Sequence, residues 1–274
     1  MDYFDKAETW DRATLETVQL ARLKTTIQQA GRAPFYAKRL AEAGVSADNL
    51  RSLEDIRRIP FTSKGDLRSQ YPYGLATVPH SEFVRMHCSS GTTGTPVAVC
   101  YTQPDINSWA DLMARCLYMA GVRKDDVFQN MSGYGLFTGG LGIHFGAERL
   151  GCMTIPAGAG NSKRQLKLVK DFGTTVAHIL PSYALHLGTT LIEEGEDPKA
   201  LSLRIACVGS EPYTEETRRR IEALFDMKVY NSYGLSEMNG PGVAFECQYQ
   251  NGLHLWEDAY LLEIIDPNTG KLGP

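Results

Sequence analysis

The feature that most constrains the fold is a regular alternation of helical and strand patterns between residues 105 and 231. Amphipathic segments alternate with short apolar runs rich in β-branched residues. This alternation predicts an α/β fold with a mostly parallel sheet, because each helix returns the chain to the start of the next strand. The expected helices are 105–120, 141–150, 162–172, 182–194 and 214–225, and the expected strands are 127–131, 152–155, 174–180, 203–208 and 227–231.

The flanking segments have different patterns. Residues 12–30 have amphipathic helical spacing and end at Gly31, and Ser52 resembles the cap of a second, short helix. After residue 240, three short apolar runs and the turn DPNTG favour antiparallel strands, expected at 243–247, 252–256 and 260–265. The sequence therefore predicts a helical segment over 1–80, an α/β core over 81–240 and an antiparallel β segment over 241–274.

Composition bounds the classes of partner. The 274 residues are 43% hydrophobic, enough for a sizeable core, and the net charge of −4 gives no electrostatic reason to expect nucleic acid or an anionic membrane. No apolar run approaches the roughly 20 residues of a membrane span, and no signal peptide is recognisable. Six cysteines without paired spacing favour free thiols in a reducing compartment, with the cytoplasm as the expected location. Small neutral or acidic ligands remain as expected partners.

A glycine- and hydroxyl-rich stretch, SSGTTGTPV, lies between expected strands at 83–88 and 97–101. Glycines let the backbone approach a ligand closely, and successive amides with neighbouring hydroxyls can donate hydrogen bonds to phosphate oxygens. The stretch fits neither the Walker pattern nor the GxGxxG pattern of dinucleotide sites, and a flexible hairpin turn is the alternative interpretation. The residues expected to contact a polyanion are Ser89, Ser90, Gly91, Thr92, Thr93 and Gly94.

Two more polar segments follow expected strands. NSYGLSE occupies residues 231–237, and GSEP occupies residues 209–212. Ligands of parallel α/β sheets bind at the carboxyl ends of strands, where these segments lie. The alternatives are a capped turn with a solvated Glu for the first segment and an ordinary helix start for the second.

In the order in which they follow one another along the chain, the three segments resemble the signature segments of adenylate-forming acyl-CoA ligases. The resemblance implies that the loop 89–94 holds the β- and γ-phosphates of ATP, that Tyr233 stacks on adenine and that Ser236 meets the α-phosphate. It also implies that Glu237 holds Mg²⁺, a hard cation that prefers carboxylate oxygen. The implied catalytic residues are Thr92, Thr93, Ser236 and Glu237, and the implied nucleotide-binding residues outside the loop are Gly209, Ser210, Glu211, Pro212, Asn231, Ser232, Tyr233, Gly234 and Ser236.

The segments GYGLFTGGLG, LPSYAL, YGLSEMNGPGVAFEC and GLHLWED are similar to phenylacetate-CoA ligase and its relatives. This resemblance covers nearly the whole chain, and it implies that ATP, Mg²⁺ and CoA are used with an aryl or phenylacetate-like acid to give acyl-CoA, AMP and pyrophosphate through an acyl-adenylate. An aromatic wall and bare glycines would form a flat slot for the acid, although the aromatic side chains are alternatively core residues. The implied acid-binding residues are Ser132, Tyr134, Gly135, Phe137, Gly139 and Gly140.

Two positions depart from the family pattern. Thr95 stands where many relatives carry Lys, which removes one positive charge near the phosphates. Ser132 stands where phenylacetate-specific members usually place an aromatic residue, which leaves open an acid other than phenylacetate.

Cysteine and histidine offer few metal ligands. Cys247 and His254 have the ligand chemistry of a structural zinc found in some relatives, but they supply two of the four ligands that a tetrahedral site needs. A buried thiol and an exposed imidazole are the preferred interpretation. No motif accompanies the remaining histidines of the α/β core, which are expected to pack or to lie on the surface: His144, His178 and His186.

Relatives continue past the point where this sequence stops, with an Asp for the ribose hydroxyls, a hinge and a small domain that carries a Lys. We therefore expect an N-terminal portion of an AMP-forming ligase that binds nucleotide or acid weakly and does not complete the reaction. The alternatives are a nucleotide- or carrier-binding module that lost catalysis and an unrelated transferase for a sugar nucleotide. Pairing into a homodimer is left open. The interpretation depends on Thr92 and Glu237 facing one shared cavity.

Overall fold

The computed structural model describes residues 3–89 and 94–270, and the chain divides into two compact units. The larger unit contains residues 3–5 and Pro79–His254, and the smaller unit contains Lys6–Val78 and residues 255–270. The boundary between the units at residues 254 and 255 therefore lies inside the predicted antiparallel segment 241–274. The predicted organisation into the parts 1–80, 81–240 and 241–274 stays a prediction.

The smaller unit is helical. Helix α1 begins after Asp11, whose carboxylate accepts a hydrogen bond from the Thr14 amide at 2.8 Å. The expected helix at 12–30 and the helix capped by Ser52 are confirmed by α1 and η3. The helices of this unit are η1 (Lys6–Thr9), α1 (Arg12–Ala30), α2 (Pro34–Glu42), η2 (Ala47–Asn49), η3 (Leu53–Arg58) and α3 (Lys64–Ser69). Its apolar core consists of Ile27, Leu40, Val45 and Leu50.

Residues 255–270 contact α1 within the smaller unit. The Glu257 carboxylate accepts two hydrogen bonds from Arg12, at 2.9 and 3.0 Å, and the Glu257 carbonyl accepts one from Gln19 at 2.8 Å. The expected strand at 260–265 is wrong, because this segment forms no strand and contains only one bridge residue, at position 265. Among residues 3–89 and 94–270 no strand pairs with this segment, and the side chains of Leu262 and Ile264 are exposed.

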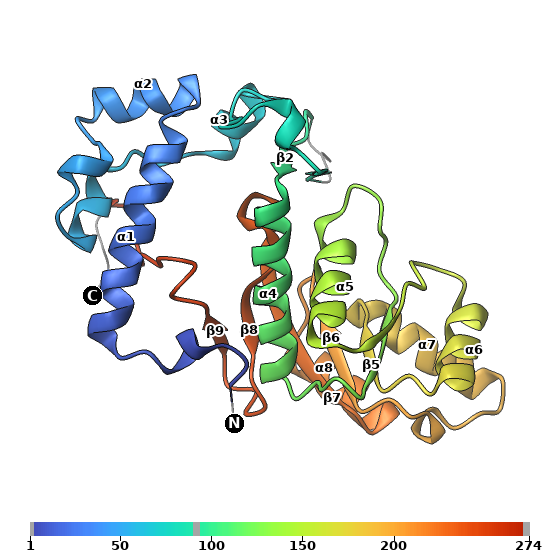
Figure 1. The fold of residues 1–274 in the computed structure, drawn as a ribbon. Helices are drawn as coiled ribbons and strands as arrows, with labels where there is room; N and C mark the ends of the chain where they lie inside the picture. Colours follow the sequence, from blue (N-terminus) through green and yellow to red (C-terminus); the bar gives the residue numbers. More distant parts are fainter. Residues whose placement is uncertain (1–2, 90–93, 271–274) are drawn as a thin grey trace. The chain divides into compact units, whose positions relative to one another are not determined.

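The larger unit is built on a seven-stranded sheet with the order β4-β3-β5-β6-β7-β8-β9 (Figure 1). Strands β4, β3, β5, β6 and β7 are parallel, as predicted, and β8 pairs with β7 in the antiparallel direction. A separate antiparallel pair joins β1 to β2. The strands are β1 (Arg85–Cys88), β2 (Ala98–Tyr101), β3 (Val127–Asn130), β4 (Met153–Ile155), β5 (Val176–His178), β6 (Ile205–Val208), β7 (Lys228–Leu235), β8 (Gly240–Glu246) and β9 (Leu253–Leu255).

Helices cover both faces of this sheet (Figure 1). One buried cluster joins α6, α7 and α8 to strands β5, β6 and β7, with Leu166, Leu187 and Ile221 among its members. On the other face, α4 and α5 pack against each other and against β8. The helices are η4 (His80–Glu82), α4 (Gln103–Met119), α5 (Thr138–Leu150), α6 (Ser162–Phe172), α7 (Pro181–Glu193), η5 (Pro198–Ala200), α8 (Glu215–Phe225) and η6 (Ser236–Met238).

The order of the strands reverses between β3 and β5. From β3 the chain crosses to β4 on one side, and from β4 it returns past β3 to β5, β6 and β7 on the other side. Right-handed crossovers then require the α5 and α6 connections to lie on opposite faces of the sheet. The carboxyl ends of β3 and β5, at Asn130 and His178, therefore flank the crevice where open α/β sheets bind ligands.

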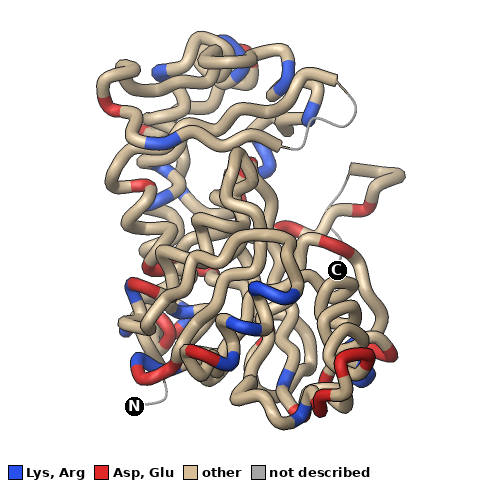
Figure 2. Tube along the Cα trace, turned by 90° about the vertical axis from the view of Figure 1, so that its right-hand side faces the viewer, with Lys and Arg blue, Asp and Glu red and all other residues tan. Residues whose placement is uncertain are grey.

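Acidic and basic residues are interspersed along the described trace (Figure 2). Many form short-range ion pairs on helices, such as Lys167 with Asp171 at 2.7 Å. Exposed pairs of this kind contribute little to stability. Among the helices of residues 3–89 and 94–270, none combines the length and apolarity that crossing a bilayer requires.

Candidate nucleotide and acid site

A pocket of about 420 Å³ lies among three segments that follow or extend the strands of the sheet. Its volume is within the range of roughly 300–1,000 Å³ typical of small-molecule sites. The segments are the start of α5, the turn between β6 and α8, and the second half of β7. The lining residues are Phe137, Thr138, Gly139, His178, Gly209, Ser210, Glu211, Pro212, Asn231, Ser232, Tyr233, Gly234, Leu235, Ser236, Gly240, Pro241 and Leu253.

The turn after β6 is held in a defined conformation. Ser210 adopts a positive φ of 68°, which is uncommon for a residue with a side chain and concentrates at binding sites. Glu211 accepts hydrogen bonds from the Ser182 amide at 2.6 Å and from the Ser182 hydroxyl at 3.0 Å. Because Ser182 lies in the first turn of α7, these bonds attach the turn to a helix N-terminus, where negative charge is favourable.

Strand β7 is longer than the sequence predicts, since it continues to Leu235 and includes most of the NSYGLSE segment. Its first half pairs with β6 up to Asn231, and its second half pairs with β8 from Ser232 onward. The second half carries Tyr233, which is 53% exposed and lines the pocket. Most of the NSYGLSE segment is therefore part of a strand that pairs with β6 up to Asn231 and with β8 from Ser232 onward, and is not a turn after a strand.

Gly234 allows the close approach of β7 to the first residues of β8. A Cβ atom at this position would lie 1.9 Å from the carbonyl oxygen of Gly240 and 2.7 Å from Cα of Pro241. Both neighbours are backbone, so neither can give way without moving the pocket wall.

The hydroxyl of Ser236 lies at the end of β7. It is 3.2 Å from the hydroxyl of Thr138, the first residue of α5, whose side chain is buried. The Ser236 carbonyl accepts a hydrogen bond from the Tyr101 hydroxyl at 3.4 Å. Glu237 follows in the short helix η6, half-buried, and is not among the lining residues.

The predicted phosphate loop is described only at its ends. Ser90, Gly91, Thr92 and Thr93 lie outside the described residues. The Ser89 hydroxyl accepts a hydrogen bond from the Val97 amide at 2.9 Å, and the Ser89 amide donates to the Val97 carbonyl at 3.0 Å. These bonds close the loop between β1 and β2. Gly94 has a φ of 129°, as the glycine-rich pattern allows. That Thr92 and Glu237 face one cavity stays a prediction.

The expected acid-binding residues are only partly brought together. Phe137 and Gly139 line the pocket, whereas Ser132, Tyr134, Gly135 and Gly140 are not among the lining residues. Helix α5 begins at Thr138, three residues earlier than predicted, so both Gly139 and Gly140 lie in its first turn and not in a loop. The Tyr134 hydroxyl is 3.1 Å from Nδ1 of His144.

A buried polar cluster connects β3, the segment after it and β5. Nδ1 of His178 lies 2.9 Å from Oδ1 of Asn130 and 3.2 Å from the Ser132 hydroxyl. Burial disfavours the charged imidazole and lowers the pKa of His178 to about 4. His178 also lines the pocket, so the expectation that it is a mere packing residue is incomplete.

The lining of the pocket does not include Cys247 or the histidines at 144, 186 and 254. His186 and His254 are exposed, and Cys247 is partly buried. Within residues 3–89 and 94–270, no three His, Cys, Asp or Glu side chains are grouped so that they could hold a metal ion. The structure therefore does not support the structural zinc considered for Cys247 and His254.

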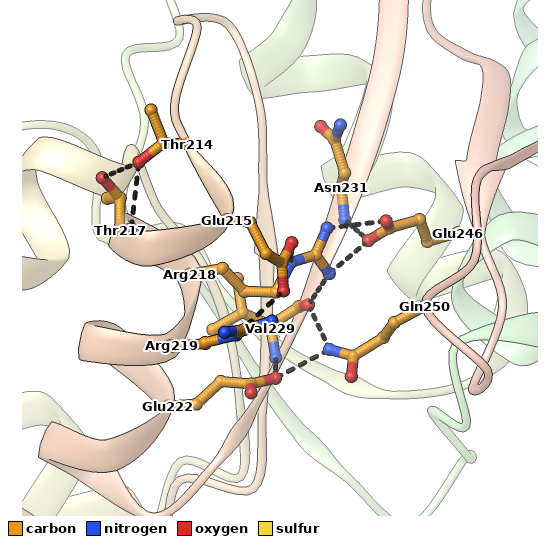
Figure 3. A network of polar contacts seen from close by, with 10 residues as sticks. All are labelled: Thr214, Glu215, Thr217, Arg218, Arg219, Glu222, Val229, Asn231, Glu246 and Gln250. Carbon is orange, nitrogen blue, oxygen red and sulfur yellow. Dashed lines mark hydrogen bonds and ion pairs between the residues drawn. The ribbon is translucent and has the colours of Figure 1, made fainter.

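A buried ion pair joins α8 to β8 and contacts the backbone of Asn231, a residue of the pocket lining (Figure 3). Arg218 donates to the two carboxylate oxygens of Glu246 at 2.7 and 2.6 Å, and the two side chains are 7% and 5% exposed. Glu246 also accepts the amide N–H of Asn231 at 2.6 Å, while Arg218 donates to the Val229 carbonyl at 2.8 Å. The Glu246 carboxylate raises the pKa of Arg218. The pair thus fixes β7 where it changes partner from β6 to β8.

Sequence reasoning missed three contributors to the site. Thr138 stands between two residues that were expected to bind the acid, and this position is the signal that could have identified it. His178 is a polar residue in the apolar run TTVAHIL, a pattern that indicates a buried side chain with a specific partner. Glu246 lies in a run that reads as an ordinary strand, and its partner Arg218 is 28 residues away in the sequence.

The pKa of His178 leads to a prediction for stability. The folded protein takes up a proton on His178 near pH 4, whereas the unfolded chain does so near the ordinary value of 6.5. Protonation therefore favours unfolding as the pH falls from 6.5 to about 4. Once His178 is fully protonated, the free energy of unfolding is lower by about 3 kcal/mol. Urea unfolding of wild type and His178→Leu at pH 7.5, 5.5 and 4.5 should show a steeper decline for wild type. Parallel declines would contradict a buried neutral imidazole, and His186→Leu, at an exposed position, serves as the matched control.

The fold and the pocket together define an α/β protein with a small-molecule site at the carboxyl end of a parallel sheet. The model of the AMP-binding enzyme family matches residues 16–274, and the chain belongs to this family. Its fold is that of the N-terminal domain of adenylate-forming enzymes, as the sequence predicted.

Comparison with known proteins gives close relatives over the whole chain. It is 47% identical over 272 residues to a phenylacetate-coenzyme A ligase of Pseudomonas putida, covering 98% of this chain and 62% of the relative. A ligase of the same name from Thermus thermophilus is 46% identical, with 100% of this chain and 62% of the relative covered. The chain thus spans about three-fifths of the length of these curated relatives.

A solved structure agrees with this result. A 2-hydroxyisobutyryl-CoA ligase in complex with 2-HIB-AMP and CoA in the thioesterification state superimposes with a TM-score of 0.93 at 31% identity. The match covers 100% of this chain and 60% of that chain. The resemblance to phenylacetate-CoA ligases that the sequence segments indicate is therefore confirmed.

Proposed function

We propose that this chain provides the adenylate-forming site of an ATP-dependent carboxylate-CoA ligase that acts on an aryl or phenylacetate-like acid. The observation that carries the proposal is the single pocket shared by the 209–212 turn, the second half of β7 and the first turn of α5. The resemblance to adenylate-forming ligases implies that the first two bind nucleotide and that the third binds the acid. The relatives named for phenylacetate and for 2-hydroxyisobutyrate both activate carboxylic acids, which supports this class of substrate.

The pocket suits a nucleoside monophosphate group. Tyr233 offers an exposed ring for stacking on adenine, and the glycines at 209 and 234 leave backbone surface without side chains. A Cβ atom at Gly209 would lie 2.5 Å from the Ser232 hydroxyl, so a side chain there would disturb the same wall. The Ser236 hydroxyl, held by Thr138, would donate to an oxygen of the α-phosphate.

The donor set near Ser236 fits Mg²⁺ bound mainly through the nucleotide. Glu237 is the carboxylate that would hold the ion, and the described residues offer no cluster of three acidic or imidazole side chains. Mg²⁺ commonly uses one or two carboxylates together with substrate phosphates and water. When bound, Mg²⁺ would offset the negative charge of the phosphates.

The proposed reaction has two steps. A carboxylate oxygen of the acid attacks the α-phosphorus of ATP, and the bond to pyrophosphate breaks to give an acyl-adenylate. The CoA thiolate then attacks the acyl carbonyl carbon, and AMP leaves. In the first step, the acid needs no general base because a carboxyl group is ionised at neutral pH. The contribution of this chain is to hold the two reactants in line and to donate hydrogen bonds to the α-phosphate.

Activity with a panel of acids tests the proposal. A version of the protein that continues through the C-terminal portion of its relatives is incubated with ATP, Mg²⁺ and each of several aryl and short-chain acids, and pyrophosphate release and hydroxylamine-trapped acyl groups are measured. AMP binding is measured in parallel by isothermal titration calorimetry. AMP binding without product would favour the alternative of a binding module that lost catalysis. Absence of both would refute an adenylate site.

Glu237→Gln is the sharpest single variant for the proposed role of Mg²⁺. We expect Mg²⁺-dependent binding of ATP to fall at least roughly tenfold, because a neutral amide replaces the charged ligand, a loss of about 1.4 kcal/mol. AMP binding without Mg²⁺ should change little, since the substitution keeps the size of the side chain. Glu216→Gln, at an exposed position on α8, is the matched control. Unchanged Mg²⁺ dependence in Glu237→Gln would assign the ion to other residues and favour the sugar-nucleotide alternative.

A further inference from the structure

The strongest unassigned feature is the polar cluster of Asn130, Ser132 and His178 at the wall of the pocket. It lies where β3 and β5 end, at the reversal of strand order described above, and its three side chains are less than 10% exposed. A buried polar group is costly unless it is satisfied, so the hydrogen bonds of this cluster determine which atoms remain for a ligand.

The hydrogen bonds fix the orientation of the Asn130 amide. One of its terminal atoms lies 2.7 Å from the Gly140 carbonyl, which can only accept, so that atom is the Nδ2 donor. The other terminal atom is then Oδ1, which can only accept. It receives the Ser132 hydroxyl at 2.8 Å and the Ser132 amide at 3.2 Å.

The orientation of Asn130 in turn sets the tautomer of His178. Nδ1 of His178 is 2.9 Å from Oδ1 of Asn130, so Nδ1 must carry a proton and donate it. With its pKa lowered to about 4 by burial, the ring is neutral at pH 7. A neutral ring with a proton on Nδ1 leaves a lone pair on Nε2, which makes that nitrogen a hydrogen-bond acceptor.

Nε2 of His178 is the ring nitrogen that the cluster leaves for a ligand, because the hydrogen bonds of His178 within the described residues use Nδ1. Within residues 3–89 and 94–270, Nε2 has no hydrogen-bond partner. It keeps some accessible surface, because the fully enclosed side-chain nitrogens and oxygens without a partner do not include it. Because His178 is otherwise buried and lines the pocket, the surface left on Nε2 faces that space.

We propose that His178 determines specificity, with Nε2 accepting a hydrogen bond from a hydroxyl or amino group of the carboxylic acid. The inference rests on the proposed function, which places the acid in this pocket. An acid without such a group would displace water from Nε2 and leave the acceptor unpaired, whereas a hydroxyl or amino group would replace the lost hydrogen bond. The same bonds explain why Ser132 stands where an aromatic residue is usual in phenylacetate-specific relatives, since its hydroxyl supports the Asn130–His178 pair.

Binding of matched probes to the purified chain tests the inference. The probes are AMP and non-hydrolysable acyl-sulfamoyl adenosines made from phenylacetate, from its three ring-hydroxylated isomers and from the corresponding ring-amino acids. Wild type should bind at least one hydroxylated or aminated probe roughly tenfold more tightly than the phenylacetyl probe, the upper range for one neutral hydrogen bond. His178→Leu should lose this preference and keep its affinity for AMP. His186→Leu, the same substitution at an exposed position of α7, should behave as wild type.

The outcomes separate this inference from the proposed function. If neither AMP nor any acyl probe binds, the proposed function fails. If the probes bind but wild type prefers none of the substituted ones, or if His178→Leu retains the preference, the inference about His178 is overturned and the proposed function stands. Should His178→Leu not fold, His178→Phe replaces it, and the wild-type preference decides the question by itself. Ser132→Ala, which leaves the Asn130–His178 bond in place, should reduce the preference less than His178→Leu does.

Discussion

Replacing Arg218 by Met is expected to lower the free energy of unfolding by about 3–5 kcal/mol, because it leaves the Glu246 carboxylate buried without its charged partner. Both oxygens of that carboxylate receive hydrogen bonds from Arg218, and the two side chains are almost fully enclosed. Urea unfolding monitored by circular dichroism measures the loss. AMP affinity should fall as well, since the Asn231 amide depends on the same carboxylate for its acceptor.

Two further variants define the origin of this loss. Arg219→Met changes the next residue of α8, whose side chain is 77% exposed and forms an ion pair of 3.7 Å with Glu215. It should cost less than about 1 kcal/mol, as surface pairs do. The double variant Arg218→Met/Glu246→Leu should be more stable than Arg218→Met alone, because it removes the unpaired charge. A loss for Arg218→Met no larger than that for Arg219→Met would show that the buried pair does not fix β7.

Gly234→Ala is also expected to have a large effect, because it should lower both the free energy of unfolding and the affinity of the pocket for AMP. The new Cβ would lie 1.9 Å from the Gly240 carbonyl oxygen, so β7 and the start of β8 must separate. Overpacking of this kind costs about 1–3 kcal/mol in well-packed interiors, and a contact with backbone is at the upper end. Because the connection between β7 and β8 carries Ser236 and β7 carries Tyr233, AMP affinity should fall at least roughly tenfold, as calorimetry would measure.

Gly133→Ala is the matched control for this prediction. It adds the same methyl group in a segment where a Cβ atom would meet nothing within 4 Å, and it lies outside the pocket lining. Its unfolding free energy and AMP affinity should stay near those of wild type. If Gly234→Ala also matched wild type in both measurements, the close approach of β7 to residue 240 would not shape the pocket.

Most of the α/β core could be predicted because its elements are long enough to show their period. The helix at 162–172 and the strand at 152–155 correspond closely to α6 and β4. Their signals are local: apolar spacing within the element and Gly or Asn at its ends, such as Gly173 with a φ of 61°. The same local signals placed the 209–212 and 231–236 segments at the carboxyl end of the sheet, where both line the pocket.

The parts that could not be predicted depend on contacts between distant residues. The extension of β7 beyond Asn231 comes from pairing with β8, and the polar residues Ser232 and Tyr233 give no strand pattern of their own. The alternation at 260–265 resembles a strand, but no neighbouring strand pairs with it among the described residues. The role of His178 depends on Asn130 and Ser132, more than 40 residues earlier in the chain.

The division into two units provides separate spectroscopic probes of their unfolding. All six cysteines lie between residues 88 and 247, in the larger unit, whereas Trp10 and Trp256 belong to the smaller one. Cys116 and Cys207 are fully buried, and burial raises the pKa of Cys152 to about 11, so these thiols should react with an alkylating reagent only after the larger unit opens. In a Trp109→Phe background, tryptophan fluorescence would then follow the smaller unit while thiol labelling followed the larger one, and a difference between the two midpoints would measure how independently the units fold.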